Sequence, residues 1–383
     1  MYSRLLKPPA KSFFLFGPRG TGKTTWVKSA FPEAVYLDLL EAEVYLALLA
    51  NPQRLETYIP AGFSGWIVLD EIQKVPALLN EVHRLIEKKR WKFILTGSSP
   101  RKLRREGSNL LAGRALTCAM HPLTAVEMGN DFNLQAVLQN GMLPSVGTEA
   151  DPARYLHSYV RTYLEEEIRQ EGLARNLAAF SRFLESASFS QGSMLNVSEV
   201  SRDCGVERKM VESYFGILED LMIARRLPVF TRRSKRKMAT HSKFYFFDTG
   251  VFRTLRPSGP LDAAEEAEGP AFETLFLQNL LAINDSLDLG YTVHYWRTAT
   301  KVEVDFVLYG PKGLLAFELK RGDRVRADSL SGLNAFATDY PKARRFLVYG
   351  GERRLHLDGI EVWPITELLH ELPKLLENPQ IPT

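Results

Sequence analysis

One short segment carries the residue types that bind a nucleoside triphosphate, in the spacing G-x-x-x-x-G-K-S/T. It runs from Gly17 to Thr24 and reads GPRGTGKT. Glycines let the backbone curl so that its N–H groups face phosphate oxygens, and a helix that follows adds its dipole. In such a loop Lys23 reaches the β- and γ-phosphates and the Thr24 hydroxyl ligates Mg²⁺, so we expect ATP and Mg²⁺ as cofactors. The expected nucleotide-binding residues are Gly17, Pro18, Arg19, Gly20, Thr21, Gly22, Lys23, Thr24 and Thr25.

Two carboxylates, Asp70 and Glu71, follow the apolar run 66–69, which predicts a buried strand. In P-loop enzymes that hydrolyse their nucleotide, one carboxylate holds Mg²⁺ through water and a second polarises the attacking water. By itself such a pair could simply cap the helix that follows. After a complete phosphate loop the catalytic interpretation is favoured, with Asp70 as a metal residue and Glu71 as a catalytic one.

Two more residues are candidates for contact with the γ-phosphate. The predicted strand 93–95 leads into Thr96 and Ser98, and either hydroxyl could reach the water between Asp70 and the phosphate. We assign this role to Ser98; its alternative is a helix cap. Arg114 could compensate γ-phosphate charge as an arginine finger, either within its own chain or, in an oligomer, across a subunit boundary. Surface arginines are common, so a purely structural role is the alternative.

A second group of carboxylates lies in the C-terminal third. Asp305 belongs to the predicted strand 303–309, and Glu318 and Lys320 belong to the next, 314–320. Residues two apart in a strand face the same side of a sheet. If the strands pair, these side chains converge and could hold a divalent metal that activates water against a phosphodiester. The alternative is a set of ordinary polar residues on a solvated face.

These residues need elements that position them. Strands at 12–16, 34–37, 66–69 and 93–95 alternate with helices at 24–31 and 76–89, which predicts an α/β fold with a parallel sheet. From 124 to 226 helical patterns dominate. A loop or linker is expected at 257–270, then a helix at 271–282 and strands at 292–297, 303–309, 314–320 and 345–349. We predict three domains: 1–130, 131–255 and 256–383.

The middle segment predicts a winged helix. A helix over 195–205 and one over 207–222, joined by a tight turn at Gly205, are typical of a helix-turn-helix. Strand-like runs at 226–230 and 243–247 bracket a basic stretch, as the two strands of a wing would. This stretch could contact nucleic-acid phosphates, or it could be a solvated loop or a protein contact. Its basic residues are Arg232, Arg233, Lys235, Arg236 and Lys237.

Several motifs together resemble the AAA-type ATPases of bacteria and archaea that carry a C-terminal domain of unknown function. They are GPRGTGKT, IVLDEIQ, ILTGSS, LAGRALTCAMHPLTAVE, KFYFFDTG and the C-terminal YWR, EVDFVL and FELK. The Asp, spacer, Glu-x-Lys pattern is similar to the restriction-endonuclease superfamily, which often adds an acidic residue, here Glu273, beside its metal. The resemblance implies an ATPase core, a winged helix and a nuclease-like α/β domain. It also implies a second Mg²⁺ or Mn²⁺ ion, with Glu273, Asp305 and Glu318 as ligands and Lys320 as a catalytic partner.

Composition limits the remaining choices. With 383 residues, 45% hydrophobic and 25% charged, the chain is neither disordered nor fibrous, and two cysteines make no disulfide framework. No apolar run is long enough to span a membrane and no signal peptide is evident, so we expect a cytoplasmic protein. The predicted function is Mg²⁺-dependent ATP hydrolysis on or near DNA, with a nuclease-like C-terminal domain. The alternative is a nucleotide-dependent switch whose C-terminal domain binds DNA or a protein without cleaving it.

Overall fold

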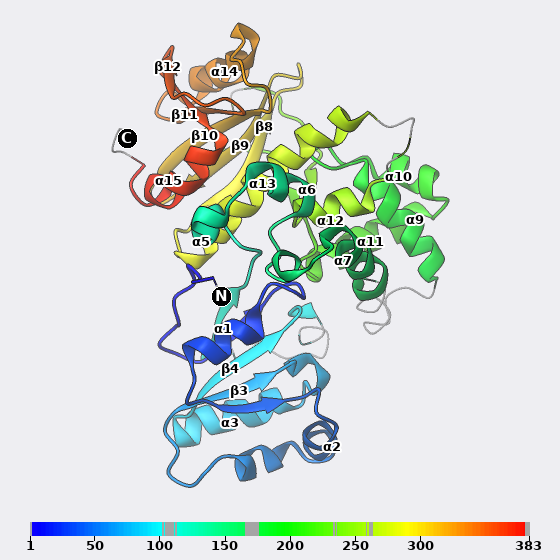
Figure 1. The fold of residues 1–383 in the computed structure, drawn as a ribbon, viewed down its shortest axis with the longest axis vertical. Helices are drawn as coiled ribbons and strands as arrows, with labels where there is room; N and C mark the ends of the chain where they lie inside the picture. Colours follow the sequence, from blue (N-terminus) through cyan, green and yellow to red (C-terminus); the bar gives the residue numbers. More distant parts are fainter. Residues whose placement is uncertain are drawn as a thin grey trace. The chain divides into compact units, whose positions relative to one another are not determined.

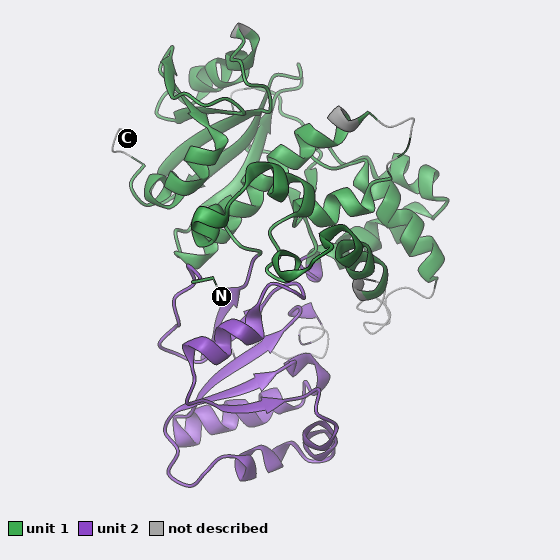
Figure 2. Cartoon of the chain, in the orientation of Figure 1, with its two compact units in different colours: residues 1–3, 122–219, 223–383 green, residues 4–121, 220–222 purple. Residues whose placement is uncertain are grey.

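The structure is a computed structural model that describes residues 2–101, 103, 111, 113–164, 176–232, 234, 236–257, 259 and 263–379. The chain forms two compact units (Figure 2). One contains residues 4–121 and 220–222, and the other contains residues 1–3, 122–219 and 223–383. Within the described ranges, no helix is both long and apolar enough to cross a membrane.

The smaller unit is built on a five-stranded parallel sheet in the order β2-β3-β4-β1-β5 (Figure 1). Both faces are covered, because alternate side chains of β1 enter different cores: Phe14 and Phe16 one, Phe13 and Leu15 the other. The parallel α/β arrangement predicted for this segment is confirmed. The strands are β1 (Phe13–Phe16), β2 (Val35–Asp38), β3 (Trp66–Asp70), β4 (Lys92–Gly97) and β5 (Leu116–Ala119).

Helices lie on the two faces of this sheet. The buried apolar side chains of α3 (Leu78–Lys89) enter the core that holds Phe14. Trp26 and Val27 of α1 (Lys23–Ala30) enter the core on the other face of the sheet. The sequence did not predict α2 (Ala42–Ala50) or β5. The pattern of β5 explains the omission: it is a short edge strand of sequence LTCA, with its side chains exposed or half-buried.

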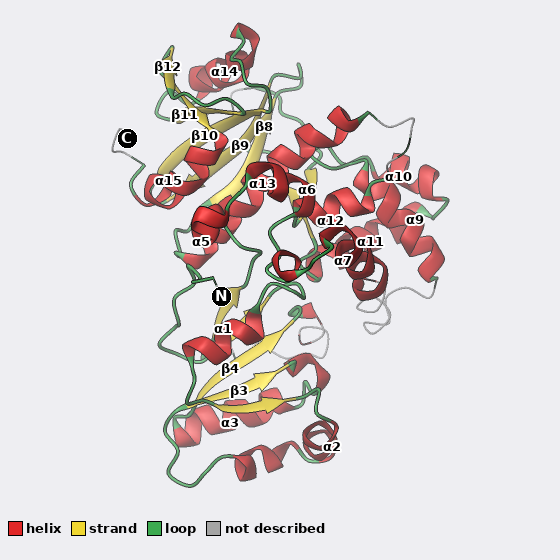
Figure 3. Cartoon of the chain, viewed as in Figure 1, coloured by secondary structure: helices red, strands yellow, loops and turns green. Residues whose placement is uncertain are grey.

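The larger unit begins with helices (Figure 3). The predicted helix-turn-helix is present as a pair of helices, with Gly205 between them in the left-handed region at φ 65°. The described helices are α5 (Ala125–Met128), α6 (Leu134–Asn140), α7 (Pro152–Ser158), a π-helical turn (Tyr159–Leu164), α9 (Leu177–Ser188), α10 (Val197–Cys204), α11 (Arg208–Asp220) and α12 (Thr249–Leu255).

The strands after the helix pair differ from the predicted wing. β6 (Ala224–Leu227) pairs antiparallel with β7 (Lys243–Phe246), but β6 ends before Val229. Val229 and Met238 instead form bridges to Tyr295 and Thr298 of the C-terminal part. The basic stretch is therefore anchored on that part at both ends and is not the tip of a free hairpin.

Side-chain contacts of the basic stretch agree with this position. The Arg232 guanidinium lies 4.7 Å from the centre of the Tyr309 ring, and Arg236 pairs with Asp339 at 2.9 Å. Lys237 is exposed. Arg233 and Lys235 lie outside the described residues.

A six-stranded mixed sheet, ordered β12-β13-β11-β10-β9-β8, forms the C-terminal part. The four predicted strands are all present, and the sequence missed the two short ones at the far edge. The strands are β8 (Thr292–Arg297), β9 (Glu303–Gly310), β10 (Gly313–Lys320), β11 (Arg344–Tyr349), β12 (Leu355–Leu357) and β13 (Ile360–Pro364); the helices are α13 (Ala264–Ser286), α14 (Ser331–Asp339) and α15 (Ile365–Glu377).

The predicted loop at 257–270 is partly wrong, because α13 begins at Ala264 and continues through Pro270. The segment AEEAEG is rich in alanine and glutamate, which favour helix, and Pro270 lies in the second turn. These preferences outweigh the Gly-Pro pair that suggested a linker. Glu273 lies within both the predicted helix 271–282 and the observed α13, so its assignment to a helix is unchanged.

Candidate functional site

The phosphate loop has the backbone that its glycines were expected to permit. Gly22 precedes α1 in the left-handed region at φ 87°, where a side chain would be strained. A Cβ on Gly17 would lie 2.2 Å from the Met120 carbonyl oxygen, so only glycine fits. The Lys23 ammonium donates to the carbonyl oxygens of Gly17 (2.7 Å) and Pro18 (3.2 Å), which holds it over the loop.

Side-chain contacts brace the rest of the loop. The Thr21 hydroxyl donates to the Pro18 carbonyl at 2.8 Å, and Arg4 donates to the Thr21 carbonyl at 3.1 Å. Thr24 and Thr25 are both exposed in the first turn of α1, beside the loop. Arg19 and Gly20 are the remaining loop residues expected to bind nucleotide. They lie in the sequence between Pro18 and Thr21, which the hydroxyl hydrogen bond joins.

Asp70 ends β3 and receives three hydroxyl groups. Thr24 donates from the loop at 3.1 Å, while Tyr36 from β2 and Thr96 from β4 donate at shorter range. Asp70 is 5% exposed. The structure thus brings together the two predicted Mg²⁺ residues, Thr24 and Asp70.

Tyr36 is a part of this site that the sequence reasoning missed. Burial and the hydrogen bond to Asp70 raise the pKa of its phenol, so it remains a neutral donor. A signal was available, because the tyrosine interrupts an otherwise aliphatic run in the predicted strand 34–37.

Glu71 follows directly with a left-handed backbone, at φ 61°. Its N–H donates to the Thr96 hydroxyl at 3.4 Å and its carboxylate accepts a hydrogen bond from the Gln73 amide. Burial raises the pKa of the Glu71 carboxyl, and the Lys23 charge opposes this shift. A partly desolvated carboxylate held by a neighbouring amide is suited to act as a base toward water.

The two hydroxyl candidates at the end of β4, Thr96 and Ser98, have different partners. Thr96, not Ser98, contacts Asp70. Ser98 is buried and accepts from the Gln73 amide at 3.4 Å, so Gln73 connects Ser98 to Glu71. Ser98, the predicted residue, therefore lies in the hydrogen-bond network around Glu71. Thr96, two residues earlier, orients Asp70.

We expect Thr96→Val to lower the kcat of ATP hydrolysis by about tenfold, because losing the hydroxyl frees Asp70 and leaves its buried oxygen with one donor fewer. Valine keeps the branched shape of the strand residue. The control is Thr117→Val on the exposed side of β5. Steady-state hydrolysis at saturating ATP measures the effect; equal kcat in both variants would contradict the role given to Thr96.

Arg114 and the phosphate loop lie at opposite ends of the parallel strands β1 and β5. β1 and β5 run parallel, with Phe13 opposite Leu116. Gly17 follows the end of β1, whereas Arg114 precedes the start of β5. Its guanidinium pairs with Glu87 of α3. The arginine-finger role of Arg114 stays a prediction.

Three C-terminal carboxylates gather around a residue that the sequence reasoning did not consider. The Lys243 ammonium, on β7, lies 3.2 Å from Asp305 Oδ1, 2.5 Å from Glu303 Oε1 and 3.8 Å from Glu273 Oε2. Its side chain is 3% exposed. A lysine at the start of an aromatic strand, KFYF, was the available signal.

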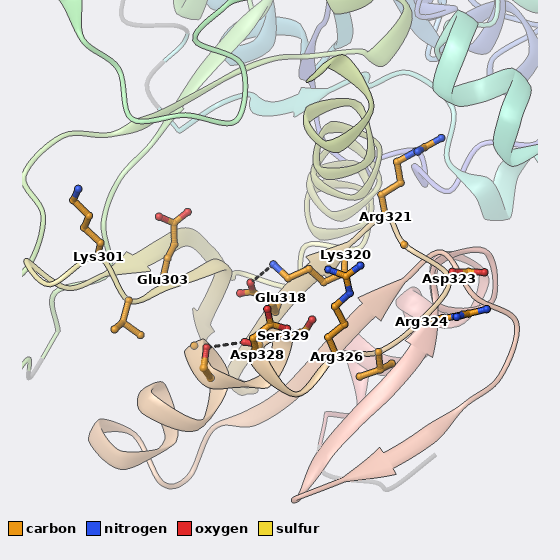
Figure 4. Close-up of a pocket in the computed structure, with 15 residues that line it drawn as sticks. Lys301, Glu303, Glu318, Lys320, Arg321, Asp323, Arg324, Arg326, Asp328 and Ser329 are labelled. Carbon is orange, nitrogen blue, oxygen red and sulfur yellow. Dashed lines mark hydrogen bonds and ion pairs between the residues drawn. The ribbon is translucent and has the colours of Figure 1, made fainter. Parts of the chain in front are cut away.

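Glu318 and Lys320 lie on one face of β10, as predicted. The Lys320 ammonium donates to Glu318 Oε1 at 2.7 Å, an ion pair drawn in Figure 4. Asp305 Oδ2 accepts the Leu319 backbone N–H at 2.9 Å, which fixes the carboxylate of β9 against β10. Glu273 accepts from the Tyr245 hydroxyl at 2.6 Å.

Burial sets the protonation of this cluster. It raises the pKa of Glu318 to about 8 and that of Glu273 to about 7, and the Asp305 charge adds to both shifts. For Lys243, burial lowers the pKa, but the surrounding acidic side chains raise it well above its usual value. Lys243 is therefore charged while it is enclosed by carboxylates.

These contacts do not fit the expected second metal ion. The ammonium of Lys243 already lies among the carboxylates that would have served as ligands. In the part of the chain that the structure describes, no group of three or more His, Cys, Asp or Glu side chains is arranged to hold a metal.

A pocket of about 890 Å³ opens beside Glu303, Glu318 and Lys320 (Figure 4). Charged side chains of both signs line the pocket in nearly equal number. The basic residues are Lys301, Lys320, Arg321, Arg324 and Arg326, and the acidic ones are Glu303, Glu318, Asp323 and Asp328.

Three family models match successive parts of the chain. Residues 9–129 match an AAA domain, which supports an AAA-type ATPase with nucleotide-binding activity. Residues 132–262 and 268–368 each match a domain of unknown function, DUF8612 and DUF4143. Uncharacterized proteins of Mycobacterium bovis and Mycobacterium tuberculosis are each 28% identical over 367 residues, or 93% of this chain and 80% of theirs.

Two solved structures match this chain at low identity. A protein from Vibrio cholerae covers 90% of this chain and 97% of its own at 14% identity, and PCH-2 of C. elegans covers 53% and 61% at 13% identity. Both superpositions have a TM-score of 0.24, too low to support a structural argument.

Proposed function

We propose that the N-terminal unit hydrolyses ATP with Mg²⁺ and that the C-terminal domain binds a partner without cutting nucleic acid. The observation that supports the first half is the convergence of the Thr24, Tyr36 and Thr96 hydroxyls on Asp70, directly before Glu71. It joins the phosphate loop to the candidate catalytic strand. In this assignment Lys23 binds the β- and γ-phosphates, and Glu71 accepts a proton from the attacking water.

The residues present fit Mg²⁺. Thr24 Oγ1 and Asp70 Oδ2 are oxygen ligands of the kind Mg²⁺ prefers, already 3.1 Å apart. When bound, the ion neutralises charge on the β- and γ-phosphate oxygens. Thr96 and Tyr36 hold Asp70 in place, and Gln73 holds Glu71.

Thr24→Ala tests the metal assignment. Without the hydroxyl, the Mg²⁺ concentration for half-maximal ATP hydrolysis should rise by about tenfold or more, because one ligand is lost. Thr25→Ala, the adjacent exposed threonine of the same helical turn, is the control. EDTA should stop hydrolysis by the wild-type chain. Metal-independent hydrolysis, or an equal effect of the two substitutions, would contradict the assignment.

The second half of the proposal is supported by Lys243. Its buried ammonium among Glu273, Glu303 and Asp305 favours a binding role over a metal-dependent nuclease. The nucleotide state would then control a C-terminal surface, as in a switch. DNA is one partner to test, since the pocket lining and the exposed Lys237 supply cations for phosphate contacts.

The full-length chain should leave supercoiled plasmid intact with Mg²⁺ or Mn²⁺, with and without ATP. Agarose electrophoresis measures nicking and linearisation. Nicking that EDTA stops and that Asp305→Ala removes would contradict the non-cleaving role and restore the nuclease interpretation.

A further inference from the structure

Side chains alternate along β7, and this alternation directs Lys243 into the C-terminal acidic cluster. The cluster consists of Glu273, Glu303, Asp305 and Glu318. Phe244 and Phe246 face one side, where Phe244 packs against Phe215 of α11 at a ring-centre distance of 5.0 Å. Lys243 and Tyr245 face the other side, as the two-residue period of a strand requires. The strand therefore belongs to the helical core by one face and to the acidic cluster by the other.

Three carboxylates from two elements surround the ammonium. Glu303 and Asp305 come from β9 and Glu273 comes from α13, with oxygens at 2.5, 3.2 and 3.8 Å from the Nζ. Carboxylate oxygens gathered from separate elements around one point are the usual surroundings of a divalent cation. In this protein the cation at that point is the ammonium group of Lys243.

The charges of the cluster show why the ammonium is needed. Four carboxylates converge, and the cations paired with them in the described structure are Lys243, Lys320 and Arg297. Arg297 pairs with Glu303, and Lys320 pairs with Glu318 from the half-exposed side. Among the described residues, Lys243 alone contacts both Asp305 and Glu273, so without it these two carboxylates lose their cation.

Glu318 has one carboxylate oxygen that is available as a metal ligand. Glu318 is 9% exposed, and its Oε2 atom is buried without a hydrogen-bond partner in the described structure. Figure 4 shows its carboxylate at the pocket, next to Lys320. The Asp305 charge acts on Glu318, so this oxygen belongs electrostatically to the cluster around Lys243.

We propose that the Lys243 ammonium takes the place of a divalent cation in the C-terminal domain, so that the native chain binds no metal there and loss of the ammonium creates a divalent site. The ligands of the created site are the three carboxylates that surround the ammonium, Glu273, Glu303 and Asp305, and the buried Oε2 atom of Glu318 is a further oxygen for the ion. This inference rests on the non-cleaving role proposed above and assigns that role to one residue.

The test is Mn²⁺ binding to the full-length, nucleotide-free chain, measured by calorimetry and by the electron paramagnetic resonance signal of free Mn²⁺. Lys243→Ala should bind one Mn²⁺ more than wild type, with at least about tenfold higher affinity than any wild-type C-terminal binding. Its thermal midpoint should rise with added Mn²⁺, because an ion that binds only the folded state stabilises it. Adding Asp305→Asn to Lys243→Ala should remove both effects.

Controls separate this site from the nucleotide site and from general charge effects. Lys320→Ala removes a cation that contacts only the outer oxygen of Glu318, and it should gain no Mn²⁺. If Lys243→Ala fails to fold, Lys243→Gln, which keeps a shorter polar side chain without the charge, should also gain the ion. No added binding in either variant would overturn the inference, as would wild-type Mn²⁺ binding that Asp305→Asn removes. Plasmid cleavage by the wild type would instead count against the proposed function.

Discussion

Glu71→Gln should bind ATP with nearly wild-type affinity and hydrolyse it at least about a hundredfold more slowly, since a general base contributes on the order of 10² to 10⁴ in rate. Glutamine keeps the size of the side chain and its contact with the Gln73 amide through one oxygen, but it cannot accept the proton of the attacking water. The position is half-buried and directly follows Asp70.

Two measurements separate binding from turnover. Equilibrium binding of a fluorescent ATP analogue should give similar dissociation constants for wild type and Glu71→Gln, while single-turnover hydrolysis should differ. Glu33→Gln, an exposed glutamate of the same unit, is the matched control. Wild-type hydrolysis by Glu71→Gln would remove this residue from the mechanism.

Lys23→Ala should show the opposite pattern. Its ammonium is held over the loop by the Gly17 and Pro18 carbonyls, ready to meet phosphate charge, so its loss should weaken ATP binding by about tenfold or more. Lys11→Ala, an exposed lysine just before β1, is the control. Equal affinity in Lys23→Ala and Lys11→Ala would contradict the loop assignment.

The nucleotide site was largely predictable because its signals are local. The loop, the strand ending in Asp70 and the strand ending near Thr96 are each visible in a few residues. The choice between Thr96 and Ser98 depends on register: Leu69 lies opposite Leu95, so Asp70 is beside Thr96. Sequence alone did not define that register, and it gave no sign of the edge strand β5 that places Arg114 away from the loop.

The C-terminal cluster was predictable only in part, for a different reason. Asp305 and Glu318 lie on strands joined by a short turn, so their approach follows from one hairpin. Lys243 reaches Asp305 from 62 positions away. A strand pattern shows that Lys243 and Tyr245 share a face, but the partner of that face is decided by how the helical part packs on the C-terminal sheet.

Asp248→Ala should lower the free energy of unfolding of the larger unit by about 3 to 5 kcal/mol, through the loss of a helix cap and of buried acceptors. Asp248 is fully buried and accepts N–H groups from Met142 (2.8 Å), Gly250 (2.9 Å) and Val251 (3.2 Å). The first comes from the chain after α6 and the others from the start of α12, so one carboxylate joins two segments. Alanine leaves all three donors without an acceptor.

The pH dependence of this effect has a defined sign. Burial raises the pKa of Asp248 from 3.8 to about 6 in the folded chain, even though the three N–H groups act to lower it. The folded state therefore binds the proton more tightly than the unfolded state, and the stability from this group is greatest below pH 4 and declines as the pH rises to about 6. The destabilisation by Asp248→Ala, measured by urea unfolding against the exposed control Asp203→Ala, should be larger at pH 4.5 than at pH 7. If the destabilisation by Asp248→Ala were instead larger at pH 7 than at pH 4.5, the carboxylate would be stabilised in its charged form. The N–H groups would then outweigh burial in setting its pKa.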